Sequence, residues 1–281
     1  MAYNTFRMEN SKLYRRKLIW IEMAGMGLLV LLLYALMVPM TKMGTGPVQE
    51  LVASMGWPNG VYESLSTAGG SSLGGYLAII LVAVAVGQEY TWRTMHLWLS
   101  RGLSRTTLLV VKFASFLAPL ALLVLTALVT GAIGSALVTL QADGSVNLVD
   151  LNVGKAALRA LYTTYTLLPY AAITLFVTVV TRSTTAGLGI TIAFAFMVEG
   201  LLIQLLSLAN DSVARIGQFL PSKLAQSLLF TSEQFVQIRM DSEPLVAQLL
   251  DPMPAAALIA GYVVVFLGLA VWSFRRQDLT A

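Results

Sequence analysis

The sequence contains no cysteine and a single histidine among its 281 residues. The absence of cysteine excludes disulfides, thiolate nucleophiles and sulfur-rich metal sites. Charged residues are also scarce, at 11% of the chain, compared with about 25% in an average soluble domain. Hydrophobic residues make up 57%. A single soluble core does not absorb that apolar excess, so the composition indicates an integral membrane protein.

The main feature of the sequence is a set of long uncharged runs. Five of them, over residues 23–41, 64–88, 113–142, 160–181 and 253–274, approach or exceed the ~20 residues that a helix needs to cross a bilayer. A sixth run, over 183–210, is interrupted only by Glu199. We therefore expect an all-α integral membrane protein with six transmembrane helices, folded as one membrane domain over residues 1–281.

The basic residues are distributed unequally between the two sides of such a bundle. Six spans place both termini on one side, and twelve of the 18 Lys and Arg residues lie there: Arg7, Lys12, Arg15, Arg16, Lys17, Arg93, Arg101, Arg105, Lys112, Arg182, Arg275 and Arg276. The other six lie on the opposite side: Lys42, Lys155, Arg159, Arg215, Lys223 and Arg239. The positive-inside rule therefore predicts cytoplasmic termini in the cell (inner or cytoplasmic) membrane.

The cytoplasmic arm, residues 1–17, is polar and basic. Its second half predicts a short interfacial helix over 10–17, capped by Asn10 or Ser11, with Leu13 and Tyr14 facing the bilayer. A disordered basic arm is the alternative. The first span starts at Leu18 without a preceding cleavable small-residue site, which predicts a retained helix rather than a signal peptide.

Two further segments are expected on the extracytoplasmic side. After the first span, Gly44-Thr45-Gly46-Pro47 and the turn signal over 57–60 predict a compact, irregular loop. The longer segment over 211–254 mixes prolines with apolar stretches that are too short to cross a bilayer. It predicts short interfacial or re-entrant helices before the sixth span.

Motifs for catalysis are missing from the sequence. The only Gly-Lys pair, at 154–155, is followed by alanine, so it does not match the Gly-Lys-Ser/Thr end of a phosphate-binding loop. His96 is the only histidine, which excludes a His-Glu-x-x-His metalloprotease. Methionines at three-residue spacing over 23–43 raise the question of copper, but helix packing is the favoured interpretation. We expect no enzyme activity, metal or cofactor in this chain.

The net charge of +4 raises the possibility of nucleic acid as a partner. The basic residues, however, lie in short segments that flank the spans, where membrane lipid explains them. We expect no binding of nucleic acid.

The segment over 89–112, between the second and third spans, keeps apolar residues at Trp92, Met95, Leu99 and Leu103 among basic ones. Spacings of three and four residues predict an amphipathic helix that lies along the cytoplasmic membrane surface. Such a helix transmits a push from a cytoplasmic partner into both attached spans, because packed helices move as rigid units. The alternative is a basic loop that sets topology and contacts only lipid.

This segment resembles the cytoplasmic loop of permease subunits of type-two ABC transporters. That loop typically begins with Glu and an aromatic residue, continues with Gly-Thr, and ends in Arg-Pro-x-Ser-Arg and a later Lys. The matching residues are Glu89, Tyr90, Thr94, Leu99, Arg101, Ser104, Arg105 and Lys112. The departures are Arg93, where glycine is usual, and Gly102, where proline is usual. The six spans, the basic arm and the long segment before the last span extend the resemblance along the chain.

The resemblance implies a dimeric permease whose loop docks a separate ATP-binding subunit. ATP and Mg would be bound by that subunit, and the second permease would be another copy or a paralogue. The implied contact residues are Glu89, Tyr90, Arg93, Thr94, Arg101, Ser104, Arg105 and Lys112. Within this chain, we also expect Glu89 to pair with Arg93 at i,i+4 or with a cation of the partner.

Glu199 is the only acidic residue within the run over 183–210, where a carboxylate costs ~2.5–3.5 kcal/mol on insertion scales. It either contacts a substrate path, together with Gln204, or is paired structurally. The candidate structural partners are Arg159, Tyr162 and Tyr165. Glu22, at the inner end of the first span, is expected to pair with Lys17 or Lys112.

The resulting functional hypothesis is the membrane subunit of an ATP-driven ABC exporter. A secondary transporter is the first alternative, although no internal repeat supports it. A non-transporting membrane scaffold or immunity subunit is the second. The sequence does not specify the cargo.

Overall fold

The computed structural model describes residues 2–42, 46–92, 94, 98, 102–202, 216–229 and 249–277. These residues are helical almost throughout, and no β-strand occurs among them. The elements are α1 (Ala2–Tyr14), α2 (Lys17–Met37), η1 (Pro39–Lys42), α3 (Gly46–Met55), α4 (Asn59–Thr67), α5 (Leu73–Thr91), α7 (Arg105–Asp143), η2 (Leu148–Asp150), α8 (Val153–Thr181), α9 (Thr184–Ala193), η3 (Phe194–Leu202), α12 (Pro221–Leu229) and α15 (Pro252–Arg276).

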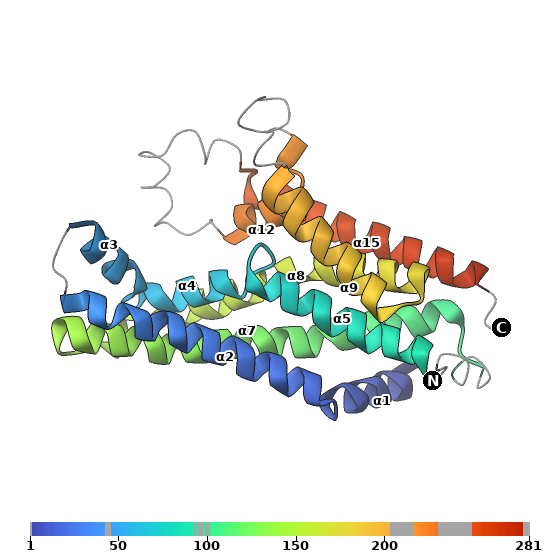
Figure 1. Ribbon diagram of the computed structural model, residues 1–281, viewed down its shortest axis with the longest axis horizontal. Helices are drawn as coiled ribbons and strands as arrows, with labels where there is room; N and C mark the ends of the chain where they lie inside the picture. Colours follow the sequence, from blue (N-terminus) through green and yellow to red (C-terminus); the bar gives the residue numbers. More distant parts are fainter. Residues whose placement is uncertain are drawn as a thin grey trace.

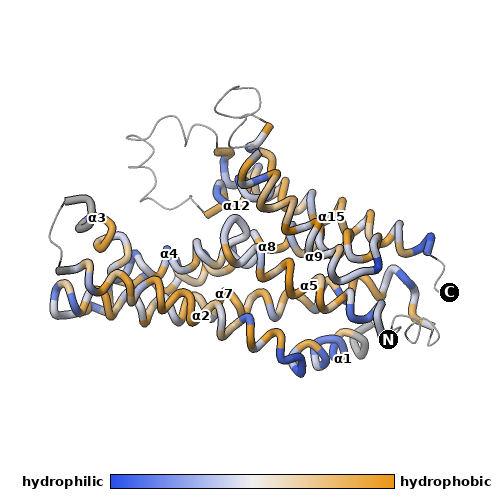
Figure 2. Tube along the Cα trace, viewed as in Figure 1, coloured by the Kyte–Doolittle hydropathy of each residue, from blue (hydrophilic) through white to orange (hydrophobic). Residues whose placement is uncertain are grey.

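Six of these helical segments are long and apolar enough to cross a membrane. They cover Lys17–Thr41, Leu73–Thr91, Arg105–Asp143, Val153–Thr181, Thr184–Leu201 and Pro252–Arg276. Figure 2 shows hydrophobic residues along these helices and hydrophilic ones at α1 and near the C-terminus. The expectation of an all-α, multi-pass membrane protein with six spans is confirmed.

The long helix α7 forms the centre of one half of the bundle. It packs against α1, α2 and α4, while α8 packs against α5, α9 and α15 in the other half (Figure 1). The shared core contains fully buried side chains such as Phe116 and Val124 on α7 and Leu167 on α8. Many apolar side chains on the outer faces remain exposed, as expected for helices that face lipid.

Local sequence signals set the ends of the long helices. Ser104 caps α7, because its hydroxyl accepts a hydrogen bond from the Thr107 amide at 3.1 Å. Gly144 ends α7 in the left-handed region, at φ +75°, where an L side chain is strained. Asn152 and Ser183 cap α8 and α9 in the same way as Ser104.

Both termini lie at the same end of the bundle (Figure 1). Contacts between distant parts of the chain connect α1, the C-terminal end of α5, the start of α7 and the C-terminal end of α15 there. This agrees with an even number of spans. We refer to this end of the bundle as the terminal end.

The N-terminal arm differs from the expected short helix over 10–17. Helix α1 begins at Ala2, so neither Asn10 nor Ser11 is its N-cap. The expected exposure of Leu13 is also wrong, since Leu13 is 3% exposed and belongs to the core cluster that includes α7. The arm is therefore an ordered helix docked on the bundle, because it has an apolar face that the bundle covers.

The segment after the first span also differs from the expected irregular loop. It forms helices α3 and α4, and α4 packs on α7. The contact is close because Gly131 of α7 has no side chain: an added Cβ would lie 1.9 Å from Oγ of Ser64. The Tyr34 hydroxyl also donates to the carbonyl of Gly60. The apolar run that begins at residue 64 is thus divided between α4 and α5.

Candidate functional site

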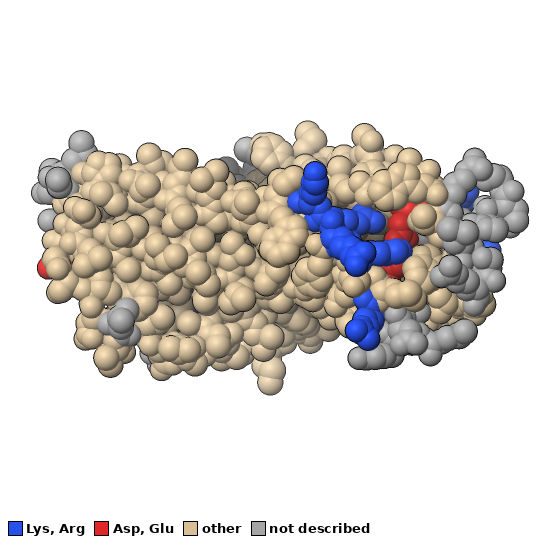
Figure 3. Space-filling view, turned by 90° about the horizontal axis from the view of Figure 1, so that it is seen from below, with Lys and Arg blue, Asp and Glu red and all other residues tan. Residues whose placement is uncertain are grey.

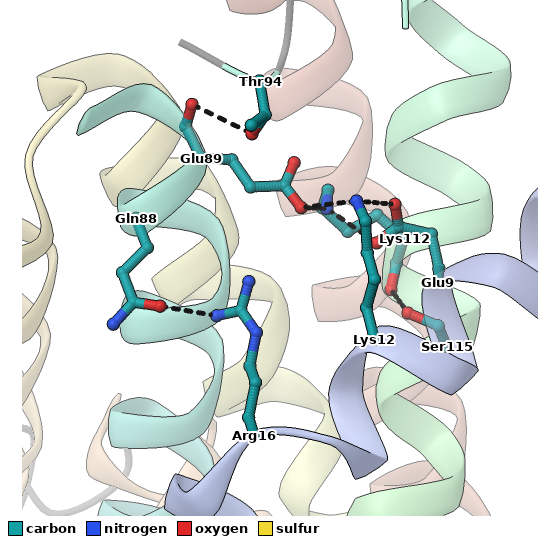
Figure 4. A network of polar contacts seen from close by, with 8 residues as sticks. All are labelled: Glu9, Lys12, Arg16, Gln88, Glu89, Thr94, Lys112 and Ser115. Carbon is teal, nitrogen blue, oxygen red and sulfur yellow. Dashed lines mark hydrogen bonds and ion pairs between the residues drawn. The ribbon is translucent and has the colours of Figure 1, made fainter. Parts of the chain in front are cut away.

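Four charged side chains meet at the terminal end of the bundle, and we call them the ion cluster: Glu9, Lys12, Glu89 and Lys112. Lys112 Nζ lies 2.7 Å from Glu89 Oε1 and 3.0 Å from Glu9 Oε2. Lys12 Nζ lies 3.0 Å from Glu9 Oε1 and 3.6 Å from Glu89 Oε1. Figure 4 shows these side chains converging from α1, α5 and α7.

Most of the ion cluster is removed from solvent. The side chains of Lys112, Glu9 and Glu89 are 2%, 3% and 3% exposed, and only Lys12, at 40%, reaches the surface. Two carboxylates and two ammonium groups balance in charge. Burial alone would raise the pKa of Glu9, but Lys112 and Lys12 outweigh it, so that pKa lies below its ordinary value. Deleting one member would leave a buried charge unpaired.

Neighbouring contacts hold the ion cluster in place. Arg16 Nη1 donates to the Gln88 side chain at 2.9 Å, which ties the start of α2 to the residue before Glu89. Ser115 Oγ donates to the carbonyl of Lys112 at 2.6 Å. The ammonium of Lys12 also lies 4.6 Å from the centre of the Trp98 ring, in a cation–π contact. Trp98 belongs to the segment expected to dock a partner, so that segment is joined to α1.

Arg105 connects the start of α7 to the end of α15. Its Nη1 donates to the carbonyls of Phe274, Arg275 and Gln277 at 2.9, 3.0 and 2.6 Å. A guanidinium is favoured at a helix C-terminus, where carbonyl groups lack intrahelical donors. Arg105 was assigned from the sequence to a partner contact, and the structure shows that it caps a helix of its own chain.

Tyr90 contributes a second connection to the C-terminal segment. Its hydroxyl lies 3.4 Å from Oε1 of Gln277. The side-chain Nε2 of Gln277 donates to the carbonyl of Val179 at 2.7 Å. The end of α5 is thereby connected to the ends of α15 and α8. None of these long-range pairs has a sequence signal, because the partners are separated by up to 187 positions.

Thr94 and Ser104, two other residues expected in the coupling segment, contact residues close to them in the sequence. Thr94 Oγ1 donates to the carbonyl of Glu89 at 3.4 Å, and Ser104 is the N-cap of α7. Arg93, Arg101 and Gln204 lie outside the described residues. The expected pairing of Glu89 with Arg93 is therefore not described, and the cations that contact Glu89 are Lys112 and Lys12.

Basic side chains gather on the surface near the ion cluster. Figure 3 shows them over α1 and the start of α2, beside acidic side chains and next to a long stretch of uncharged surface. Arg15 and Lys17, at the junction of the two helices, are exposed. This arrangement suits a bilayer boundary, where basic groups meet lipid phosphates and apolar helices enter the hydrocarbon.

Glu199 lies in η3, a π-helix that continues α9, and is 5% exposed. Its Oε2 accepts a hydrogen bond of 2.6 Å from the hydroxyl of Tyr170 on α8. The expected tyrosine partners were Tyr162 and Tyr165, and Tyr165 instead donates to the carbonyl of Ala256. Arg159, the expected ionic partner, donates to Oγ of Ser66 at 2.9 Å. A tyrosine partner was one of the alternatives that the sequence left open, but Tyr170 was not among the residues named for it.

Glu22 differs from its expected pairing. Lys112 is engaged by Glu9 and Glu89, and the buried Oε1 of Glu22 has no hydrogen-bond partner among the described residues. Among all the described residues, no group of three or more His, Cys, Asp or Glu side chains is arranged to hold a metal ion.

The fold and its polar sites define a polytopic helical membrane protein with a buried ion cluster at the end that holds both termini. Residues 62–280 match the family described as "Protein of unknown function (DUF2705)", and the chain belongs to this family. A comparison with curated proteins finds no match. Glu89, Lys112 and Glu199 lie within the matched region, whereas α1, with Glu9 and Lys12, precedes it.

Proposed function

We propose that the chain is the membrane-spanning subunit of an ATP-driven ABC exporter in the cytoplasmic membrane. Two such subunits, identical or paralogous, enclose a translocation path, and each docks a separate ATP-binding subunit on the segment over 89–112. ATP and Mg belong to that partner, and this chain converts its motion into a change of access. The basic side chains at the terminal end make that end cytoplasmic.

The observation that carries the proposal is the ion cluster. Glu89 and Lys112 are the first and last residues of the segment that resembles a coupling loop, and they contact each other at 2.7 Å. Glu9 joins α1 to the same pair. A force applied to this segment therefore reaches α1, α5 and α7 together, since buried ion pairs and packed helices move as a unit.

The exposed faces of the bundle leave room for a second permease. In the most apolar 18-residue stretches of the spans Thr184–Leu201 and Pro252–Arg276, only 22% and 17% of the residues are buried within the chain. Their exposed apolar side chains are available to lipid or to another permease. Glu199 and Gln204 are the proposed contacts with the path.

A test begins with co-purification of the full chain and an ATP-binding protein encoded beside it. The complex should hydrolyse ATP faster than the ATP-binding protein alone. Trp92, 63% exposed at the end of α5, is an apolar surface residue within the proposed docking segment. Trp92→Ala should lower the stimulation at least severalfold. Met253→Ala is the matched control, because Met253 is 84% exposed at the opposite end of the spans.

The same experiment separates the alternatives. A chain that transports cargo without an ATP-binding protein would be a secondary transporter, for which the buried carboxylate of Glu199 in a π-helix offers the supporting observation. A stable complex that shows no nucleotide turnover would indicate a membrane scaffold or immunity subunit. Either result would contradict the proposed exporter.

A further inference from the structure

A polar cavity lies between the end of the fifth span and α12. Its wall is formed by residues of the α4–α5 connection, α5, α8, η3 and α12, and its polar lining includes Ser71, Tyr76, Glu199, Ser222, Lys223 and Gln226. Figure 1 shows α12 beside the part of the bundle where α9 continues into η3. The cavity belongs to the described residues and is remote from the ion cluster, since Glu199 lies at the far end of its span from the terminal end.

Glu199 lines this cavity, and one oxygen of its carboxylate is incompletely hydrogen-bonded. Its Oε2 is engaged by Tyr170, whereas Oε1 is buried and has no hydrogen-bond partner of normal geometry among the described residues. The hydroxyl and the backbone N–H of Ser222 contact the carboxylate, but they do not give Oε1 a hydrogen bond of normal geometry. A buried carboxylate oxygen without a donor is unfavourable, so the site favours a ligand that supplies an N–H group or a positive charge.

Lys223 supplies the opposite charge on the same wall. Its Nζ donates to Oε1 of Gln226 at 3.3 Å, and no carboxylate of the described residues lies within ion-pair distance of it. The side chain is half-buried, and this burial lowers the pKa of its amine. A negatively charged group in the cavity would therefore restore a counter-charge to Lys223.

The two charges line one cavity but do not form an ion pair with each other. A single ligand that carries both an ammonium and an anionic group satisfies both. The cavity volume of about 90 Å³ corresponds to roughly six water molecules at ~15 Å³ each. That space suits a group of roughly five to eight non-hydrogen atoms. Phosphoethanolamine and small α-amino acids have this size and charge pattern.

We propose that this cavity binds a small zwitterionic group, with its primary ammonium at Glu199 and its phosphate or carboxylate at Lys223. The group is either the headgroup of an ethanolamine phospholipid or a free amino acid. A primary ammonium donates to a carboxylate oxygen, whereas a trimethylated ammonium has no N–H to donate. The site therefore discriminates ethanolamine from choline. This binding does not depend on the proposed coupling to an ATP-binding subunit.

The experiment uses the full chain in dodecyl maltoside, without ATP or any partner, and titrates it by calorimetry. The probes are phosphoethanolamine, glycine, ethanolamine, phosphocholine and inorganic phosphate. We expect phosphoethanolamine, glycine or both to bind at least tenfold more tightly than the other three. A preference for phosphoethanolamine would identify a lipid headgroup, and a preference for glycine would identify a free amino acid. If ethanolamine, which has no anionic group, bound as tightly as phosphoethanolamine and glycine, the zwitterionic assignment would be overturned.

Substitutions locate the binding. Glu199→Gln, which preserves side-chain shape, and Lys223→Met, which lies outside the spans, should each weaken the zwitterion at least tenfold. Glu50→Gln and Lys17→Met are the matched controls, because both residues are exposed and neither lines the cavity. Undiminished affinity in both cavity variants, or no zwitterion binding by the unaltered chain, would overturn the proposal. Since no nucleotide is present, these results are independent of whether the chain couples to an ATP-binding subunit.

Discussion

Lys112 Nζ lies 2.7 Å from Glu89 Oε1, although 23 positions separate the two residues. The pair joins the end of α5 to the first turns of α7, and Glu9 extends it to α1. Both ends of the segment over 89–112 are therefore fixed to each other inside the protein. A docked partner would act on a closed unit rather than on a free loop.

Loss of Lys112 should destabilise the fold strongly. Lys112→Met leaves Glu9 and Glu89 buried with Lys12 as their remaining cation in the ion cluster, and breaking a buried pair costs about 3–5 kcal/mol. The exposed Lys17 provides the control Lys17→Met, which should change stability by less than about 1 kcal/mol. Thermal unfolding of the two purified variants measures the difference. Equal unfolding midpoints would show that the ion cluster does not stabilise the bundle.

The contribution of Glu9 should depend on pH in a defined direction. Because the pKa of Glu9 is lower in the folded chain than in the unfolded one, its charge stabilises the fold above the ordinary pKa of ~4.3. This stabilisation is lost as pH falls through the lowered value. The gap in unfolding midpoint between the unaltered chain and Glu9→Gln should be constant from pH 7 to 5 and shrink towards pH 3.5. A gap that widens on acidification would contradict the assignment.

Arg105 should hold the last turn of α15 closed. Arg105→Ala removes Nη1, whose two N–H groups are shared among three carbonyls, and a hydrogen bond to a charged group contributes about 1.5–3 kcal/mol. Amide hydrogen exchange around residues 274–277 should become faster. The exposed Arg275 offers the control Arg275→Ala, whose exchange should resemble that of the unaltered chain. If amide hydrogen exchange were unchanged in Arg105→Ala, Arg105 would not cap α15.

Gly87 should be required where α5 crosses the start of α9. A Cβ at this position would lie 2.6 Å from Cα of Thr184, so Gly87→Ala forces the helices apart at a cost of about 1–3 kcal/mol. Gly261→Ala on α15 is the control, because nothing lies within 4 Å of the added Cβ. Thermal unfolding should show a loss of stability for the first variant and none for the second. A neutral Gly87→Ala would mean that α5 and α9 are not tightly packed.

The number of spans was predictable because hydropathy depends only on the local sequence. The break between α4 and α5 was missed, since residues 64–88 are uncharged throughout and hydropathy alone does not divide them. The helix start at Ala2 was missed for a related reason. The docking of Leu13 in the core is a tertiary contact that the basic composition of the arm does not reveal.

The candidate site was predictable as a set of positions but not as a set of contacts. The motif selected Glu89, Arg105 and Lys112, and the structure gives each of them a partner within the chain. Glu9 carried no signal of its own, because its role depends on α1 folding back against α7. Glu199 was conspicuous as an isolated charge in an apolar run. Its partner Tyr170 was missed because the rotation of α8 relative to η3 is set by packing.

The central claim is that the segment over 89–112 is docked by a cytoplasmic ATP-binding subunit. Because the chain has no cysteine, Trp92→Cys and Met253→Cys each carry a single reactive thiol. Each variant is labelled with a benzophenone maleimide, mixed with the ATP-binding protein and irradiated. We expect a cross-linked product of the two proteins from the label at position 92 and not from the label at position 253. No product from position 92, or equal products from both positions, would contradict the claim.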